Sequence, residues 1–147
     1  MTARGLNTEF ADADDSAGLM LWRVTNAWQA AQRRALKPFG LTHVQFVLLA
    51  SLTWLESDNP VTQKDLAKHA GTDPMMTSQV LRALESAALI ERAPHPHDGR
   101  ALILEVTQAG RDLANRAIGA VEACDRDFFE PLGGDRVKFA ALLGRLV

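Results

Sequence analysis

The sequence has very little cysteine, no long apolar run and no targeting segment, and each absence argues against a class of protein. It contains one cysteine, Cys124, in 147 residues, so it can form neither an internal disulfide nor a cysteine-rich zinc site. No apolar run approaches the ~20 residues that a membrane span needs, and the first ten residues show neither a secretory signal nor a transit peptide. These absences predict a cytoplasmic protein with no membrane partner, no cofactor and no bound metal.

The chain also lacks an overall basic charge. Its net charge is −2 and its pI is near 6.1, which argues mildly against a nucleic-acid partner. However, the first 16 residues carry a net charge of −3, because one arginine faces four acids, Glu9, Asp12, Asp14 and Asp15. The remaining body is therefore +1, and any DNA-binding surface must be a local cluster of Arg and Lys side chains. We expect residues 1–13 to form a disordered acidic tail.

Apolar residues at helical spacing predict a mainly helical chain. The expected helices cover residues 14–39, 42–56, 62–70, 73–88, 108–130 and 135–146. Thr42 with Gln45, and Thr62 with Asp65, have the spacing of capping boxes, and Asp73 before Pro74 is a helix start. The first helix begins with turns that are apolar nearly all round, so a second partner must cover them. The second helix has two apolar stripes and should be buried centrally, with Trp54 in one of them.

A short hairpin is expected after the fourth helix. Leu89–Ala93 and Ala101–Val106 read as strands, and the turn between them contains Asp98 and Gly99. Two helices joined at Gly71 form a helix-turn-helix, and the hairpin that follows them is a wing. The predicted fold is therefore mainly α with a small β-hairpin wing.

The helix that begins at Asp73 has one face that must pack inward, formed by Thr77, Val80, Leu81, Leu84 and Ala88. The opposite face presents Met75, Met76, Gln79, Arg82, Ala83 and Ser86, with Ser78 at its margin. Exposed methionines suit thymine methyl groups in a major groove, Gln79 suits an adenine edge, and Arg82 suits guanine or phosphate. The alternative is that both methionines pack under the wing or against the first helix.

The wing carries Arg92 and Arg100 beside its loop, with His95 and His97 at the tip. An arginine there can enter a minor groove. In the alternative, the hairpin is only solvated and Arg100 pairs with Asp98 or Asp65. Both interpretations can hold, since an acid can position a guanidinium while other donors remain free.

Two other classes of function compete with DNA binding as interpretations of the sequence. His95, His97 and Asp98 form a metal-like triplet, but no further ligand motif follows and Pro96 lies in a mobile loop, so we expect no enzyme. A winged-helix module that binds another protein and no DNA remains an alternative, because the net charge is near neutral.

A series of motifs in register resembles the multiple-antibiotic-resistance-regulator (MarR) family of winged-helix repressors. The series runs through Leu41–Phe46, Thr62–Ala67, Asp73–Pro74, Leu84–Glu85 and Leu89–Arg92. Its most specific part is Asp98–Arg100 followed by Val106–Gly110. The resemblance covers residues 15–147. Two departures are Ala88, where the family usually has glycine, and Gln79, where an arginine or lysine is common.

The resemblance implies a homodimer of intertwined terminal helices, with each recognition helix in the major groove of a palindromic site. It implies a single domain over 14–147, with a DNA-binding lobe at about 41–107 and dimerisation helices at about 14–39 and 108–147. The predicted DNA-contacting residues are Thr62, Gln63, Met75, Met76, Ser78, Gln79, Arg82, Arg92, His97 and Arg100.

Family members often release DNA when a small aromatic molecule binds between the dimer helices and the DNA-binding lobe. Such a pocket would be lined here by Trp22, Trp28, His43, Phe46 and Trp54. The alternative is plain core packing of these aromatic side chains. Cys124 is interpreted as inert rather than as a redox sensor.

Overall fold

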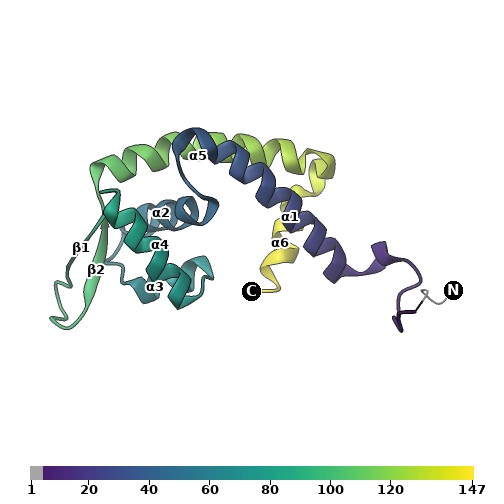
Figure 1. Cartoon of the computed structure of the whole chain (residues 1–147), viewed down its shortest axis with the longest axis horizontal. Helices are drawn as coiled ribbons and strands as arrows, with labels where there is room; N and C mark the ends of the chain where they lie inside the picture. The colour runs from purple at the N-terminus through teal and green to yellow at the C-terminus, as the bar shows by residue number, and fades with distance from the viewer. Residues whose placement is uncertain (1–4) are drawn as a thin grey trace.

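The computed structural model of the chain describes residues 5–147 and confirms a helical fold with one hairpin (Figure 1). The first four residues of the predicted acidic tail lie outside the described residues. The main elements are α1 (Ala17–Leu36), α2 (His43–Leu55), α3 (Gln63–Ala70), α4 (Pro74–Ser86), β1 (Ile90–Pro94), β2 (Leu102–Val106), α5 (Gln108–Phe129) and α6 (Arg136–Gly144). Short 3-10 turns cover Ala13–Asp15, Lys37–Phe39 and Glu130–Asp135.

The elements form a lobe and an extended pair of arms (Figure 1). Helices α2, α3 and α4 and the hairpin lie beneath one end of α5, while α1 and α6 lie toward its other end. The first helix begins at Ala17, after the cap Ser16, rather than at residue 14. Among the described residues no single helix is long and apolar enough to cross a membrane. The helices over 17–39 and 43–55 reach that length and apolar composition only when taken together, and a bend of 74° separates them.

Both predicted capping boxes are present. Thr42 Oγ1 accepts the backbone N–H of Gln45 at 3.2 Å, and the Gln45 side chain accepts the backbone N–H of Thr42 at 3.0 Å. Thr62 and Asp65 repeat this reciprocal pair at the start of α3. Each box satisfies backbone donors that a helix leaves free at its N-terminus. The sequence alone thus predicts where α2 and α3 begin.

The end of α4 differs from the prediction. The helix stops at Ser86, and Ala88 adopts a left-handed backbone conformation with φ of 59° instead of continuing the inward face. Its side chain is exposed, so its predicted packing was wrong. The backbone N–H of Leu89 closes the turn on the Leu84 carbonyl at 3.0 Å. A left-handed alanine costs roughly 1–2 kcal/mol relative to right-handed backbone, which explains why a glycine would suit this position.

The wing is an antiparallel hairpin in which Ile90 pairs with Val106 and Pro94 with Leu102. A third segment joins it, because the N–H of Leu104 donates to the carbonyl of Val61 at 2.8 Å. The sequence pattern did not predict this bridge, since a single paired residue leaves no strand periodicity. It fixes the start of α3 against the root of the wing.

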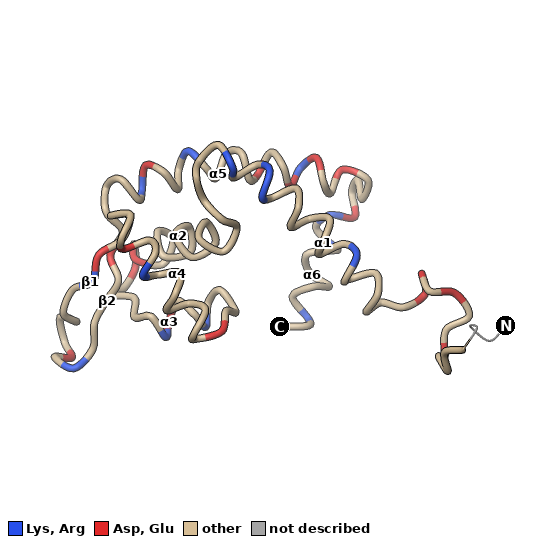
Figure 2. The backbone as a smooth tube through the Cα atoms, in the orientation of Figure 1, with Lys and Arg blue, Asp and Glu red and all other residues tan. Residues whose placement is uncertain are grey.

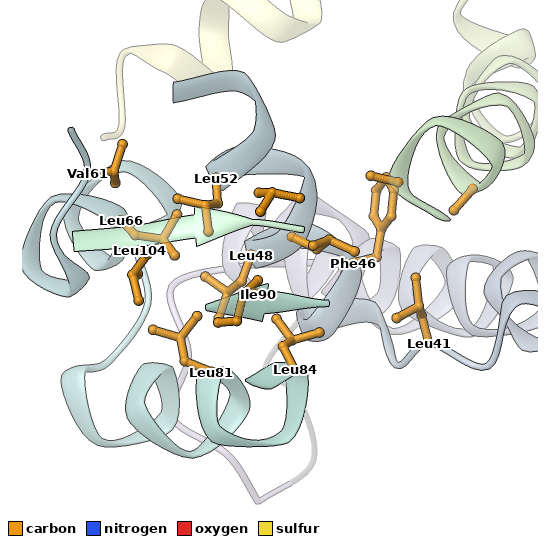
Figure 3. Packing of buried hydrophobic residues seen from close by; sticks show 14 of the residues in the cluster. Leu41, Phe46, Leu48, Leu52, Val61, Leu66, Leu81, Leu84, Ile90 and Leu104 are labelled. Atoms are coloured by element: carbon orange, nitrogen blue, oxygen red, sulfur yellow. The ribbon is translucent and has the colours of Figure 1, made fainter. Parts of the chain in front are cut away.

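The core of the lobe is made mainly of aliphatic side chains, joined by the ring of Phe46 (Figure 3). Side chains at 2% exposure or less include Leu48, Leu52, Leu66, Leu81, Leu84, Ile90 and Leu104. The central position predicted for α2 is confirmed by the burial of Phe46, Leu48, Leu49 and Leu52. Trp54 is the exception. It is 75% exposed, because it lies on the side of the last turn of α2 that the lobe leaves uncovered, so its predicted burial was wrong.

A tight junction joins the lobe to α5. Thr107 Oγ1 accepts the N–H of Gly110 at 3.0 Å and donates to the carbonyl of Ala88 at 2.7 Å. A Cβ atom on Gly110 would lie 2.0 Å from the carbonyl oxygen of Leu89. Nearby, the Glu56 carboxylate binds Arg111 at 2.6 Å and the N–H of Val106 at 3.0 Å. The glycine therefore allows α5 to touch the backbone that follows α4.

The arms leave large apolar side chains uncovered in the single chain. On α1, Leu21 is 52% and Trp22 is 67% exposed; on and after α6, Val137 and Leu146 are 81% and 75% exposed. This agrees with the expectation that a second partner covers the start of the first helix. No residue of α6 is buried within the chain.

Candidate DNA-binding surface

The exposed face of α4 is held outward by bonds at the start of the helix. The Asp73 carboxylate accepts the N–H of Met76 at 2.9 Å. Thr77, which is fully buried, donates its hydroxyl to the Asp73 carbonyl at 2.8 Å and lies 2.6 Å from the Thr72 hydroxyl. Leu81 and Leu84 continue the buried face into the core. The opposite side of α4 must consequently face outward.

The predicted outward residues are on that side. Met75 is 72% exposed and Met76 is 39% exposed. Gln79, Arg82, Ala83 and Ser86 are also exposed, and Ser78 is half-buried at the margin. The alternative in which the methionines pack beneath the wing or against the first helix is therefore wrong for this chain. The helix presents two thioethers, one amide and one guanidinium together.

Three acidic side chains around α3 and α4 accept backbone hydrogen bonds or form an ion pair within the chain. Asp65 accepts the backbone N–H of Thr62, which lowers the pKa of the Asp65 carboxyl. Asp73 caps α4, and Glu85 pairs with Arg92 at 3.0 Å. Within residues 5–147, no ion pair involves Lys64, Lys68 or Arg82. Free cations and occupied acids make this surface suited to an anionic partner even though the net charge of the chain is negative.

An open groove lies between α3 and the start of α4. It is lined by Gln63, Lys64, Ala67, Lys68, Gly71, Thr72 and Pro74. Lys64 and Lys68 were absent from the predicted site residues. Their spacing of four residues places both on one side of α3, and this spacing after the Thr62 cap was the signal that could have identified them. Gln63 lies at the beginning of the same groove, and Thr62 precedes it as the N-cap of α3.

Arg92 has a different position from the one expected of a residue beside the wing loop. Its Nε donates to Glu85 at 3.0 Å, and its Nη1 donates to the Gln63 side-chain oxygen at 3.3 Å. These bonds hold β1 against α3 and α4. Arg92 is thus bonded to both Glu85 and Gln63, and it positions the wing relative to α3 and α4.

The tip of the wing is ordered by its own polar side chains. His95 Nδ1 accepts the N–H groups of His97 and Asp98 at 3.0 and 3.1 Å, and Asp98 accepts the backbone N–H of Arg100 at 3.0 Å. The Arg100 guanidinium pairs with neither Asp98 nor Asp65. Figure 2 shows a cation beside an acid at this tip. Asp98 therefore orders the turn through the backbone, and the Arg100 side chain remains exposed with His97.

His95, His97 and Asp98 are not arranged as metal ligands. His95 Nδ1 already receives two backbone N–H groups. In the part of the chain that the structure describes, no three His, Cys, Asp or Glu side chains are close enough to hold a metal ion.

Two of the five predicted pocket residues meet in a polar cluster between α1, α2 and α5. The rings of Trp28 and His43 pack edge to face, with their centroids 4.9 Å apart. Asp125 accepts Trp28 Nε1 at 2.8 Å and the side-chain N–H of Gln32 at 2.7 Å. Burial lowers the pKa of His43, and Arg33 adds to that effect while Asp125 opposes it. Gln32 and Asp125 were missed, because a polar residue on a helix gives no periodic signal.

The other pocket residues do not converge on this cluster. Phe46 is buried in the core, while Trp22 and Trp54 are 67% and 75% exposed. His43 and Trp54 lie at opposite ends of α2, about 16 Å apart along the helix axis. Cys124 is half-buried, and burial raises the pKa of its thiol, with further increases from Asp125 and Asp127. This agrees with its interpretation as an inert thiol.

A helix-turn-helix whose second helix is exposed beside a β-hairpin defines the chain as a winged-helix protein of the DNA-binding class. Residues 41–102 match the family model described as MarR family. The chain is 40% identical over 124 residues to the uncharacterized HTH-type transcriptional regulator YdcH of Bacillus subtilis, covering 84% of each chain. It is 38% identical over 115 residues to the HTH-type transcriptional repressor Rv2887 of Mycobacterium tuberculosis, covering 77% of this chain and 80% of that one.

Solved structures of transcriptional regulators also superpose on this chain. A probable transcriptional regulator from Pseudomonas aeruginosa superposes with a TM-score of 0.82 at 26% identity, over 92% of this chain and all of that chain. Rv2887 in complex with DNA superposes with a TM-score of 0.67 at 30% identity, and in complex with salicylic acid with 0.69 at 33%. These matches cover 92% and 93% of this chain, and 98% of the other chain in each case. The chain belongs to the MarR family of transcriptional regulators.

Proposed function

We propose that this regulator is a homodimeric repressor that binds a palindromic operator through α4 and the wing, and releases it when a small aromatic effector binds. The observation that carries the proposal is the outward face of α4, with Met75, Gln79 and Arg82 exposed while Thr77 and Leu81 anchor the other side. A partner of this kind is known for a relative, since Rv2887 has been crystallised with DNA. In this proposal the protein acts in the cytoplasm.

Each exposed group has a matching feature on duplex DNA. The apolar side chains of Met75 and Met76 fit thymine methyl groups, Gln79 fits the N6 and N7 edge of adenine, and Arg82 fits guanine or a phosphate. In this proposal Lys64 and Lys68 contact phosphates beside the major groove. Thr62 and Ser78 supply hydroxyl donors to the same backbone.

The wing completes the contact in this proposal. Arg100 and His97 reach the adjacent minor groove, where narrow tracts of A·T pairs attract cations. Arg92 supports them indirectly, because its bonds to Glu85 and Gln63 fix the wing root against α3 and α4. Asp98 keeps the turn in shape without neutralising the Arg100 side chain.

The dimer follows from the uncovered apolar side chains of the arms. Leu21 and Trp22 on α1, with Val137 and Leu142 on α6, would cost free energy in water unless a second copy covered them. Two-fold symmetry then sets two recognition helices about 34–36 Å apart, one helical turn of DNA. Footprinting that found a single asymmetric half-site would contradict this geometry.

The effector proposal rests on the polar cluster of Trp28 and His43 between the arms and the lobe, and on the crystallisation of Rv2887 with salicylic acid. A ligand that binds one arrangement of the dimer better than another shifts the population toward that arrangement. If the favoured arrangement misplaces the two copies of α4, DNA affinity falls by the same coupling free energy.

The decisive experiment selects genomic DNA with the purified full-length protein and then measures binding to the selected site at two salt concentrations. We expect Arg82→Ala to lower the affinity about 5- to 150-fold, because one good base or phosphate contact is worth about 1–3 kcal/mol. Its affinity should also depend less steeply on salt if Arg82 touches a phosphate. Gln79→Ala should relax the base preference and leave the salt dependence unchanged.

Arg116→Ala is the matched control, since it removes the same charge from an exposed position on α5, outside α4 and the wing. It should bind DNA like the unmodified protein. If Arg82→Ala and Arg100→Ala also bind like the unmodified protein, or if no DNA is selected, the winged helix serves a protein partner instead.

A further inference from the structure

Sulfur is distributed unevenly over the described residues. Met75 is 72% exposed, Met76 is 39% exposed and Met20 is 38% exposed, while Cys124 is half-buried. Two of the chain's four methionines are therefore adjacent and exposed on the first turn of α4, the turn assigned above to DNA. Exposed thioethers react with two-electron oxidants to give methionine sulfoxide.

The other described sulfur atoms are less available for this chemistry. The thiol of Cys124 must ionise to become a strong nucleophile, and burial, Asp125 and Asp127 all raise its pKa. The sulfur of Met20 lies 3.9 Å from a guanidinium nitrogen of Arg23, which donates to it. No hydrogen bond to the sulfur of Met75 or Met76 is present within residues 5–147, and a thioether needs no deprotonation to react.

We propose that Met75, assisted by Met76, is an oxidation site through which a peroxide or hypohalous acid weakens DNA binding. This inference rests on the proposed function of α4. With hydrogen peroxide, the thioether sulfur attacks one oxygen, an S–O bond forms, the O–O bond breaks, and the other oxygen leaves as water after a proton shift. With hypochlorous acid, the sulfur attacks chlorine and the O–Cl bond breaks with loss of hydroxide; water then forms the S–O bond as chloride and two protons leave, one of which neutralises the hydroxide. In both cases sulfur loses two electrons.

Oxidation changes the contact that Met75 can make. The sulfoxide is polar and a strong hydrogen-bond acceptor, whereas a thymine methyl group is apolar. The edges of guanine and the O4 of thymine are also acceptors, so a sulfoxide oxygen facing them has no donor to pair with. Because the side chain is exposed in the free protein, the modification leaves the core and the cap of α4 intact.

Oxidation of Met75 to the sulfoxide is reversible, and its reversal needs no other residue of this chain. Methionine sulfoxide reductases return the oxygen to water with electrons from a thiol reductant, and one enzyme serves each sulfoxide epimer. DNA bound over α4 would cover Met75 and slow its oxidation, so operator-bound protein is protected and free protein is modified.

The test uses the full-length protein with Cys124→Ser, which removes the only thiol. The protein is titrated with hypochlorous acid, each sulfoxide is located by mass spectrometry of peptides, and affinity for a selected DNA site is measured before and after. We expect Met75 to oxidise first and the affinity of the Met75 sulfoxide form to fall about tenfold. Reductase treatment should restore it, and bound DNA should slow Met75 oxidation but not Met20 oxidation.

Two variants separate Met75 from the other sulfur atoms. In M75L/M76L, whatever its starting affinity, the ratio of affinities with and without oxidant should be near one. In Met20→Leu, that ratio should match the parent protein. If the Met75 sulfoxide form binds DNA within twofold of the reduced form, or if Met20→Leu alone removes the sensitivity, the oxidation proposal is wrong. If the reduced protein selects no DNA, the proposed function of α4 fails instead.

Discussion

The lobe differs from the arms in how it treats apolar side chains. The lobe is formed by α2, α3, α4 and the hairpin, and the arms are α1 and α6. In the lobe, leucines from α2, α3 and α4 meet the hairpin and become almost fully buried within one chain. In the arms, α6 buries no residue, and Trp22 and Val137 face water. The comparison teaches that the lobe buries its apolar side chains within one chain, together with Leu36 of α1 and Val121 of α5, whereas the arms leave apolar side chains uncovered in that chain.

The largest test of this comparison is Gly110→Ala at the junction between the lobe and α5. The new Cβ would lie 2.0 Å from the carbonyl oxygen of Leu89, and moving that oxygen would break its bond with the N–H of Thr107. We expect the free energy of unfolding to fall by about 3 kcal/mol or more, measured by urea denaturation. Gly119→Ala is the control; its Cβ meets nothing within 4 Å in this chain, so it should be neutral or slightly stabilising.

The second test concerns the arms. Leu142→Asp places a charge on the uncovered side of α6, where the native side chain is 46% exposed. The dissociation constant of the dimer should rise at least about tenfold, because a hydrophobic contact is replaced by a desolvated carboxylate. Analytical ultracentrifugation measures this rise. Asn59→Asp adds the same charge to the exposed loop before α3 and should leave the dimer unchanged; a dimer unaffected by Leu142→Asp would show that α6 does not contribute to it.

The smallest effect is expected at Ala88. Ala88→Gly should raise the free energy of unfolding by up to about 1 kcal/mol, because glycine adopts the left-handed conformation without steric cost. The gain is limited by the larger conformational freedom of glycine in the unfolded chain. Thermal denaturation measures it, and Ala87→Gly, where φ is −83°, should instead destabilise. A stabilising Ala87→Gly would show that strain at Ala88 is not the cause.

The parts that the sequence predicts well are those encoded by neighbouring residues. These parts are the capping boxes at Thr42 and Thr62, the helix break at Gly71, and the buried and exposed faces of α4. Each depends on residues only a few positions apart, so the sequence pattern predicts it directly. The outward position of Met75 and Arg82 follows by elimination once Leu81 and Leu84 are assigned to the core.

The parts that it predicts poorly depend on contacts across the fold. The exposure of Trp54 reflects where the lobe ends rather than the hydrophobicity of the residue. The bonds of Arg92 to Glu85 and Gln63 were not predicted, because its position in the wing gives no information about side chains on other helices. The cluster of Gln32 with Asp125 joins residues 93 positions apart, and no local pattern predicts such a pair.

The hydroxyl of Thr107 joins the end of α4 to the start of α5. It bonds the carbonyl of Ala88, just beyond α4, and the first turn of α5 at once. With 22 residues, α5 is a rod about 33 Å long, so a tilt of about 5° displaces one end by about 3 Å relative to the other. A tilt of α5 of this size would reach the turn beyond α4 through Thr107 as a shift comparable to the rise of one base pair.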